Sequence, residues 1–129
     1  MARGLSDEEV SRVRIHNVSR THVSYLIRDA WRFRALILGS PTYDAQLYPL
    51  MEQFTRVLTH KKLTRRVLGL FGTYGWSGGG VSTLTEFAKG GSWDLMEPIV
   101  EAHCAPTEED LKKCFELGQN VVKKILAEA

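Results

Sequence analysis

The chain has 129 residues, of which 43% are hydrophobic and 25% charged, and its formal net charge at pH 7 is +2. This length suits one domain that can bury a core without disulfides or structural metals. The small net charge gives no basis for expecting a nucleic-acid or membrane partner, and no apolar run reaches the ~20 residues that span a bilayer. Two separated cysteines and the lack of an apolar signal segment predict a cytoplasmic protein.

The first part of the chain predicts a tail, a strand and a helix. Residues 1–5 are interpreted as a tail, although a short helix from Ser6, with Glu9 completing a capping box, is an alternative. Apolar and polar residues alternate from Val13 to Val18, which predicts a half-buried strand. Residues 21–33 carry apolar side chains at helical spacing and predict a helix.

Strands and helices continue to alternate in the rest of the chain. Residues 35–39 form a nearly continuous apolar run, typical of a strand covered on both faces, and Pro41 is expected to end it. The remaining expected elements are a helix at 49–58, a strand at 66–72, a helix at 80–87, a strand within 93–104 bent near Pro98, and a helix after Thr107. This order predicts an α/β fold, a doubly wound parallel sheet of about four strands with helices on both faces.

The apolar spacing of two helices predicts which side chains they bury. The helix at 49–58 is expected to bury Leu50, Phe54, Val57 and Leu58. The final helix, with Thr107 as its N-cap, is expected to bury Leu111, Cys114, Phe115, Gly118, Val121, Val122 and Ile125.

Two loops that follow the buried strands form the candidate site. They read Ser40-Pro-Thr-Tyr-Asp44 and Gly72-Thr-Tyr-Gly-Trp-Ser-Gly-Gly-Gly80. Open α/β sheets bind ligands at the carboxyl ends of their strands, and backbone N–H groups in such loops are free to bond a ligand. The aromatic residues of both loops therefore predict a slot for a flat ring, and the alternative is a pair of surface loops without a ligand.

Other chemistries have weaker support in the sequence. Gly75-Trp-Ser-Gly-Gly79 matches the Gly-x-Ser-x-Gly pattern of a nucleophilic serine, and Asp94 and His103 follow in the hydrolase order. We consider a nucleophilic Ser77 an unfavoured alternative, because such a pattern arises easily in a glycine-rich loop. The second loop lacks the lysine of a phosphate-binding P-loop. The pair His103-Cys104 has no further ligands nearby in the sequence, so no metal site is predicted.

Three motifs together resemble the flavodoxin-like domain of the flavo-diiron proteins, which reduce oxygen or nitric oxide. They are Leu38-Gly-Ser-Pro-Thr-Tyr-Asp44, Gly69-Leu-Phe-Gly-Thr-Tyr-Gly-Trp-Ser-Gly-Gly79 and Ala105-Pro-Thr-Glu-Glu-Asp-Leu111, and Asn17-Val-Ser-Arg-Thr-His22 is also similar. The resemblance implies that FMN binds with its isoalloxazine ring between the two loops. The residues that it nominates are Ser40, Pro41, Thr42, Tyr43, Asp44, Thr73, Tyr74, Gly75, Trp76, Ser77 and Gly78.

The sequence also departs from this family. The resemblance implies a first strand and a hydroxyl-rich loop for the FMN phosphate, and neither is recognisable here, so we expect one flavodoxin-like domain over residues 1–129 that is incomplete at its N-terminus. The absent strand would lie between residues 12–18 and 35–39. Its absence predicts weakened FMN binding, and either a closed gap in the sheet or another chain at the free edge, with a homo-oligomer as our expectation.

The resemblance implies a role in electron transfer. Rubredoxin or a reductase is the expected redox partner, and the diiron domain is expected on another chain or is missing. No independent catalytic centre is visible in the sequence. The alternative functions are a flavin-less interaction module of the same fold and, less favoured, a quinone reductase.

Overall fold

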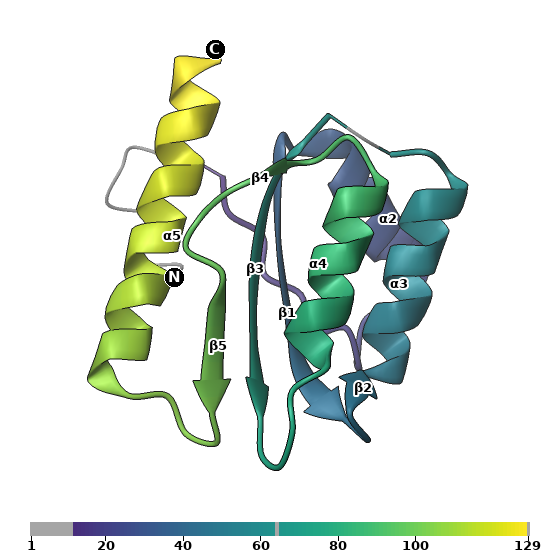
Figure 1. Cartoon of the computed structure of the whole chain (residues 1–129). Helices are drawn as coiled ribbons and strands as arrows, with labels where there is room; N and C mark the ends of the chain where they lie inside the picture. The colour runs from purple at the N-terminus through teal and green to yellow at the C-terminus, as the bar shows by residue number, and fades with distance from the viewer. Residues whose placement is uncertain (1–11, 64, 129) are drawn as a thin grey trace.

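The computed structural model describes residues 12–63 and 65–128, which form one sheet with helices on both of its faces (Figure 1). The predicted α/β class is confirmed. Expectations for residues 1–11 lie outside the described part. The elements in chain order are α2 (Val23–Arg32), β1 (Ala35–Tyr43), β2 (Gln46–Leu47), α3 (Pro49–His60), β3 (Val67–Tyr74), α4 (Gly80–Gly90), β4 (Asp94–Leu95), β5 (Val100–His103) and α5 (Glu108–Ala127).

The parallel pair β1 and β3 forms the centre of the described sheet. Their register runs from Ala35 opposite Val67 to Pro41 opposite Thr73. The Val67 N–H donates to the Arg34 carbonyl, so even-numbered residues of β1 direct their backbone groups toward β3 and odd-numbered ones away from it. The missing N–H of Pro41 therefore faces away from β3. The expectation that Pro41 ends the strand was wrong, and β1 continues to Tyr43.

A tight antiparallel hairpin follows β1 and was not expected from the sequence. Tyr43 lies opposite Gln46, so β2 pairs with the edge of β1 that faces away from β3. The two turn residues, Asp44 and Ala45, have φ of 52° and 58°. This left-handed conformation suits aspartate better than alanine, and it fixes the direction in which Tyr43 leaves the strand.

Two short strands share the other edge of β3. β4 pairs with the start of β3, where Asp94 lies opposite Val67, and β5 pairs with its end, where His103 lies opposite Tyr74. Pro98 lies between these strands, so the predicted interruption near that residue is confirmed.

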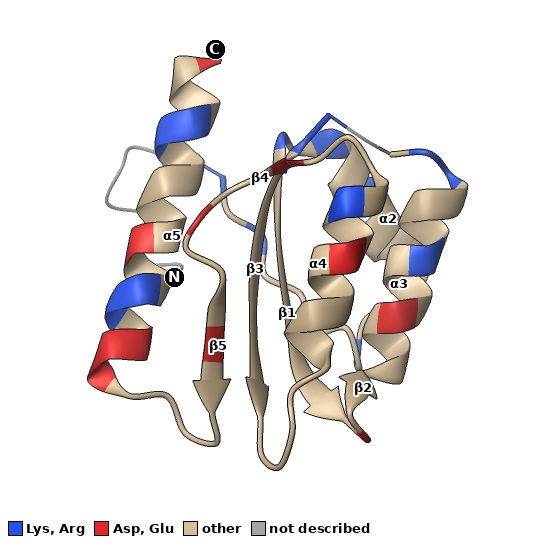
Figure 2. Cartoon of the chain, viewed as in Figure 1, with Lys and Arg blue, Asp and Glu red and all other residues tan. Residues whose placement is uncertain are grey.

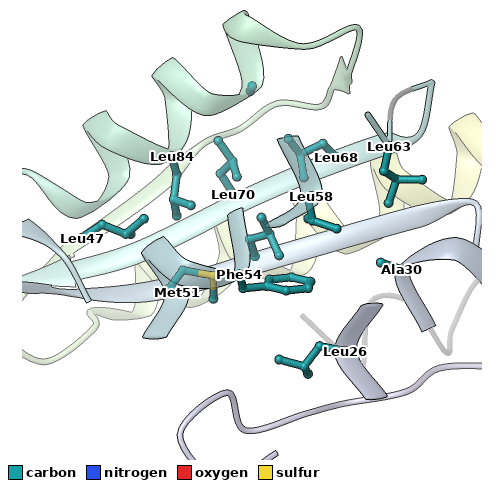
Figure 3. Close-up of a cluster of buried hydrophobic side chains, with 12 residues drawn as sticks. Leu26, Ala30, Leu47, Met51, Phe54, Leu58, Leu63, Leu68, Leu70 and Leu84 are labelled. Atoms are coloured by element: carbon teal, nitrogen blue, oxygen red, sulfur yellow. The ribbon is translucent and has the colours of Figure 1, made fainter. Parts of the chain in front are cut away.

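One large apolar cluster fills the face of the sheet under α2, α3 and α4. Figure 3 shows Leu58 of α3 and Leu84 of α4 packed against Leu68 and Leu70 of β3, and all four side chains are fully buried. The expected stripe of α3 is wrong at one position, because Leu50 is 38% exposed and Met51 is buried in its place.

Among the described helices, only α5 covers the opposite face of the sheet (Figure 1). Leu117 packs over Gly69, where a Cβ atom would already lie 3.4 Å from the Leu117 Cδ1 atom. Leu117 is fully buried, whereas Leu111 is 57% exposed, so the expectation for Leu111 was wrong. Thr107 caps α5 through a complete capping box with Asp110, as predicted. The hydrogen bonds from Thr107 hold the pKa of the Asp110 carboxyl below its ordinary value.

The predicted strand at 13–18 is wrong. Residues 12–17 pair with no described strand. The alternation of side chains is present in the sequence, but a strand also needs a neighbour for its backbone groups. A side-chain contact holds this segment instead: His16 Nε2 donates to Asp29 Oδ2 of α2 at 2.6 Å.

No helix in the described part of the chain is long and apolar enough to cross a membrane.

Candidate functional site

The two predicted loops lie side by side at the carboxyl ends of β1 and β3 (Figure 1). The Gly80 N–H, at the first residue of α4, donates to Thr42 Oγ1 at 3.2 Å. The backbones also touch, because a Cβ atom on Gly79 would overlap the carbonyl of Ala45. A side chain at position 79 would therefore push the loops apart, which is the physical reason for glycine there.

The residues of the first loop divide into buried and exposed groups. Ser40 is buried, and its hydroxyl donates to the Pro41 carbonyl and accepts from the Tyr48 N–H, so it holds the loop in shape. Tyr43 is 60% exposed and touches Tyr48 edge to face, and Asp44 is exposed at the tip of the hairpin. The groups open to a ligand are thus the Tyr43 ring and the Asp44 carboxylate.

The second loop presents one fully exposed aromatic ring and a run of backbone N–H groups. Trp76 is 103% exposed relative to an extended reference, so nothing in the described chain covers its indole. Within the described residues, the N–H groups of residues 75–78 have no hydrogen-bond acceptor. Unpaired donors in a loop bind either water or a ligand with acceptor atoms.

A histidine that the sequence did not single out for this site supports the second loop. His103 of β5 stacks on Tyr74 with ring centroids 4.9 Å apart, and its Nε2 donates to the Gly75 carbonyl at 2.9 Å. These contacts fix the start of the loop. His103 reaches these partners because β5 pairs with the end of β3. No local sequence pattern predicts that pairing.

The site has an acidic rim. Asp44 is the charged residue of the first loop, and Glu101 of β5 lies beside Gly78, where a Cβ would be 3.3 Å from Glu101 Oε1. Figure 2 shows one red acidic segment on β5 and another at the tip of the hairpin formed by β1 and β2. Residues 40–44 and 73–79 include no lysine or arginine. The two loops therefore offer aromatic surface and N–H donors, but no cation.

The serine-hydrolase alternative does not fit the geometry. Asp94 lies at the amino end of the sheet, opposite Val67, and pairs with Lys124 at 3.3 Å. His103 bonds the Gly75 carbonyl rather than the Ser77 hydroxyl. The three residues therefore form no triad. In the described part of the chain, no group of three or more His, Cys, Asp and Glu residues could hold a metal ion.

Comparison with known proteins finds relatives that include nitric oxide and oxygen reductases. No model of a protein family matches the chain. A nitric oxide reductase of Moorella thermoacetica is 30% identical over 129 residues, which is 97% of this chain and 32% of that protein. The chain thus spans about a third of the length of the curated relatives that it matches.

Solved structures show the same fold. The rubredoxin oxygen:oxidoreductase of Desulfovibrio gigas superposes with a TM-score of 0.91 at 24% identity, over 98% of this chain and 31% of that one. The Flv1 flavodiiron core of Synechocystis superposes with a TM-score of 0.91 at 20% identity, over 99% of this chain and 32% of that one. Flavodoxins share the fold as well. The fold is flavodoxin-like, and the predicted similarity to the flavodoxin-like domain of flavodiiron proteins is confirmed.

Proposed function

We propose that this chain binds FMN at the carboxyl ends of β1 and β3 and serves as an electron-transfer domain. The observation that carries the proposal is the adjacency of two loops that each expose an aromatic ring, Tyr43 and Trp76. Planar rings stack well on such side chains. Bound FMN would supply reversible one- and two-electron chemistry, and the protein would supply binding and orientation.

The residues present fit the isoalloxazine ring of FMN. Tyr43 and Trp76 would contact its faces or edge, and the unpaired N–H groups of residues 75–78 would donate to its carbonyl oxygen and ring nitrogen atoms. Ser40 and Thr42 would act indirectly, because their hydroxyls are already used to shape the first loop and to hold α4. Asp44 and Glu101 would place negative charge beside the ring.

The same residues do not fit the phosphate of FMN. Neither loop carries a lysine or arginine, and the two carboxylates of the rim repel an anion. Charge-assisted hydrogen bonds contribute about 1.5–3 kcal/mol each, so their absence is expected to weaken FMN binding by a factor of ~100 or more. We therefore expect contacts with the isoalloxazine ring to contribute most of the affinity of the described residues for FMN.

The names of the relatives support a proposal for the redox partner. Names such as rubredoxin oxygen:oxidoreductase support a rubredoxin-like protein as the electron donor. The described residues hold no cluster for a diiron centre, so we propose that any reduction of oxygen or nitric oxide takes place on another domain or chain.

Flavin fluorescence tests the proposal. Stacking on Trp76 should quench the emission of both FMN and riboflavin, and the two dissociation constants should differ by less than about tenfold if the phosphate adds little. Nanomolar FMN binding with much weaker riboflavin binding would show that a phosphate site exists. Unchanged emission of both flavins would refute the ring site.

A flavin-less interaction module is the second candidate, and the acidic, cation-free rim favours it. A colourless purified protein that binds no flavin but retains its fold would support this candidate. A yellow protein with flavin absorbance bands would exclude it.

A further inference from the structure

The outward face of α2 carries aromatic and basic side chains together. Tyr25 and Trp31 are 53% and 49% exposed, and Arg28 and Arg32 are exposed on the same helix. At 3.6 residues per turn, these four positions fall within one arc of about 120°. The outer face of a surface helix is usually polar throughout, so two half-exposed aromatic rings among arginines need an explanation.

Two cation–π contacts order this face of the helix. The Arg28 guanidinium lies over the Tyr25 ring, 5.2 Å from its centroid. The Arg66 guanidinium lies over the Trp31 ring at 5.9 Å, and Arg66 Nη2 also donates to the Trp31 carbonyl at 3.3 Å. A guanidinium that is already held in this way loses less side-chain entropy when it binds a partner.

Arg34 extends this surface beyond the end of α2. Arg34 and Arg66 stand at equivalent positions, each directly before one of the paired strands β1 and β3. They therefore lie on adjacent segments of the chain at the amino end of the sheet. The α2 surface is thus formed by Tyr25, Arg28, Trp31, Arg32, Arg34 and Arg66.

The positive charge of the α2 surface is neutralised only in part by the described chain. Arg28 pairs with the buried Asp29 at 3.2 Å. No described carboxylate lies within ion-pair distance of Arg32 or Arg34. Arg32 is in the last turn of α2, where the helix dipole favours a cation, but Arg34 lies outside the helix. An excess of positive charge therefore remains at this surface.

The two ends of the sheet differ in charge. Lys61, Lys62 and Arg65 lie in the connection from α3 to β3 and add positive charge at the amino end. Figure 2 shows this connection in blue, at the end of the sheet opposite the acidic rim formed by Asp44 and Glu101. An acidic molecule is therefore attracted to the amino end and repelled from the two loops of the candidate site.

A protein fits the α2 surface better than a nucleic acid does. Trp, Tyr and Arg are the residue types that contribute most to protein–protein interfaces, and all three meet here. A guanidinium covers one face of each exposed ring, which closes that face to the stacking of bases. Asp94, at the start of β4, adds negative charge at the amino end of the sheet and would repel a chain of phosphates that extended along it.

We propose that the α2 surface binds an acidic segment of a partner protein, which places an apolar side chain against the exposed part of Trp31 and carboxylates on both sides of it. Arg32 and Arg34 would bind these carboxylates, because the two N–H groups of a guanidinium fork can donate to the two oxygens of one carboxylate. The surface lies at the end of the sheet opposite the two loops, so this inference does not rest on flavin binding.

NMR of the whole chain, labelled with ¹⁵N, tests the proposal. The probe is a peptide with blocked ends that has two acidic residues on each side of one phenylalanine. The indole N–H of Trp31 and the amides of residues 31–35 should shift on titration, whereas the amides of residues 75–78 should not. Binding should weaken at least about fivefold when the salt concentration is raised about tenfold. The same peptide with amides in place of its four carboxylates is the matched control and should cause no shifts.

Paired variants separate local from general charge effects. Arg32→Gln combined with Arg34→Gln should weaken peptide binding about tenfold, and Trp31→Ala about threefold. Lys112→Gln combined with Lys123→Gln removes the same charge from exposed positions of α5, and the affinity should stay within about twofold of the wild type.

Three results would overturn the proposal. The first is a set of shifts in the wild type that is scattered over the chain or centred on the two loops, a result that depends on no variant. The second is equal weakening of peptide binding by the two double variants. The third is tighter binding of a thymidine oligonucleotide than of the peptide at equal charge, which would show that the surface prefers phosphates.

Discussion

The Gly80 N–H donates to Thr42 Oγ1 across 3.2 Å, and this bond joins the first turn of α4 to the end of β1. Gly79, the N-cap of α4, has no side chain to satisfy that turn. Thr42 therefore does from a neighbouring strand what a capping serine or aspartate does locally. Helix start and loop position are coupled by one hydroxyl, so a change at Thr42 should affect both.

Removal of this hydroxyl tests the coupling. Thr42→Val keeps the shape of the side chain but leaves the Gly80 N–H without its acceptor, and it should lower the free energy of unfolding by about 1 kcal/mol. It should also weaken flavin binding, because the two loops are no longer tied. Urea denaturation and flavin titration measure the two effects. Thr42→Ser keeps the hydroxyl and should resemble the wild type, and equal losses in both variants would contradict the argument.

The exposed indole of Trp76 should matter for ligand binding but not for stability. Trp76→Ala removes a ring that touches nothing else in the described chain, so the urea midpoint should stay unchanged. Flavin affinity should fall about fivefold to tenfold, equivalent to roughly 1 kcal/mol of stacking. Trp31→Ala, at another exposed tryptophan, is the matched control and should leave flavin affinity unchanged. Weaker flavin binding by the Trp31→Ala variant would indicate that the flavin binds to a different surface.

The end of α3 contains a lysine where glycine is the preferred residue. Lys62 has φ of 57°, its N–H donates to the Thr59 carbonyl, and the Leu63 N–H donates to the Leu58 carbonyl. This is the Schellman motif, in which the left-handed position costs a side-chain-bearing residue about 1 kcal/mol.

Lys62→Gly should therefore raise the free energy of unfolding by about 0.5–1 kcal/mol, measured by urea denaturation. Lys61→Gly, one residue earlier at φ of −81°, is the control and should not stabilise the protein. Stabilisation by both substitutions to the same degree would refute the role of the left-handed conformation.

Asp29 should make stability depend on acid pH. The hydrogen bond from His16 is the main reason that the pKa of the Asp29 carboxyl is lowered, and Arg28 lowers it further. A lowered pKa in the folded state means that ionised Asp29 contributes stability above its unfolded pKa of about 3.9. That contribution is lost as the pH falls below this value through the folded pKa.

Asp29→Asn should accordingly be less stable than the wild type near neutral pH, and the difference should shrink below about pH 4. Thermal unfolding of both proteins, from neutral pH to below about pH 4, measures this difference in stability. A constant difference at every pH would show that Asp29 acts through its shape rather than its charge.

The order and type of most elements from residue 21 onward followed from the sequence, because apolar periodicity and capping residues are local signals. Thr107 caps α5 as predicted, and the predicted interruption near Pro98 separates β4 from β5. Pairing is not a local signal, and it caused the errors. Pro41 continues β1 because its missing N–H faces away from β3, whereas residues 12–17 alternate correctly but have no partner among the described residues.

The candidate site was predictable only in part, because some of its residues follow from local signals and others depend on strand pairing. Tyr43 and Trp76 follow buried strands, so both could be placed at the carboxyl end of the sheet. The supports of the loops come from elsewhere in the chain. His103 reaches Gly75 only because β5 pairs with β3, and Gly79 meets Ala45 only because of a hairpin with two left-handed residues. These contacts depend on sheet register, which the sequence does not state.

The most direct test of the central claim is the position of a bound flavin ring between the two loops. Nuclear Overhauser contacts from the methyl groups of the isoalloxazine ring to the protein would locate it. Our account predicts contacts to the aromatic protons of Tyr43 or Trp76 together with shifted amide signals at residues 75–78. Contacts to other parts of the surface, with both loops unperturbed, would contradict it.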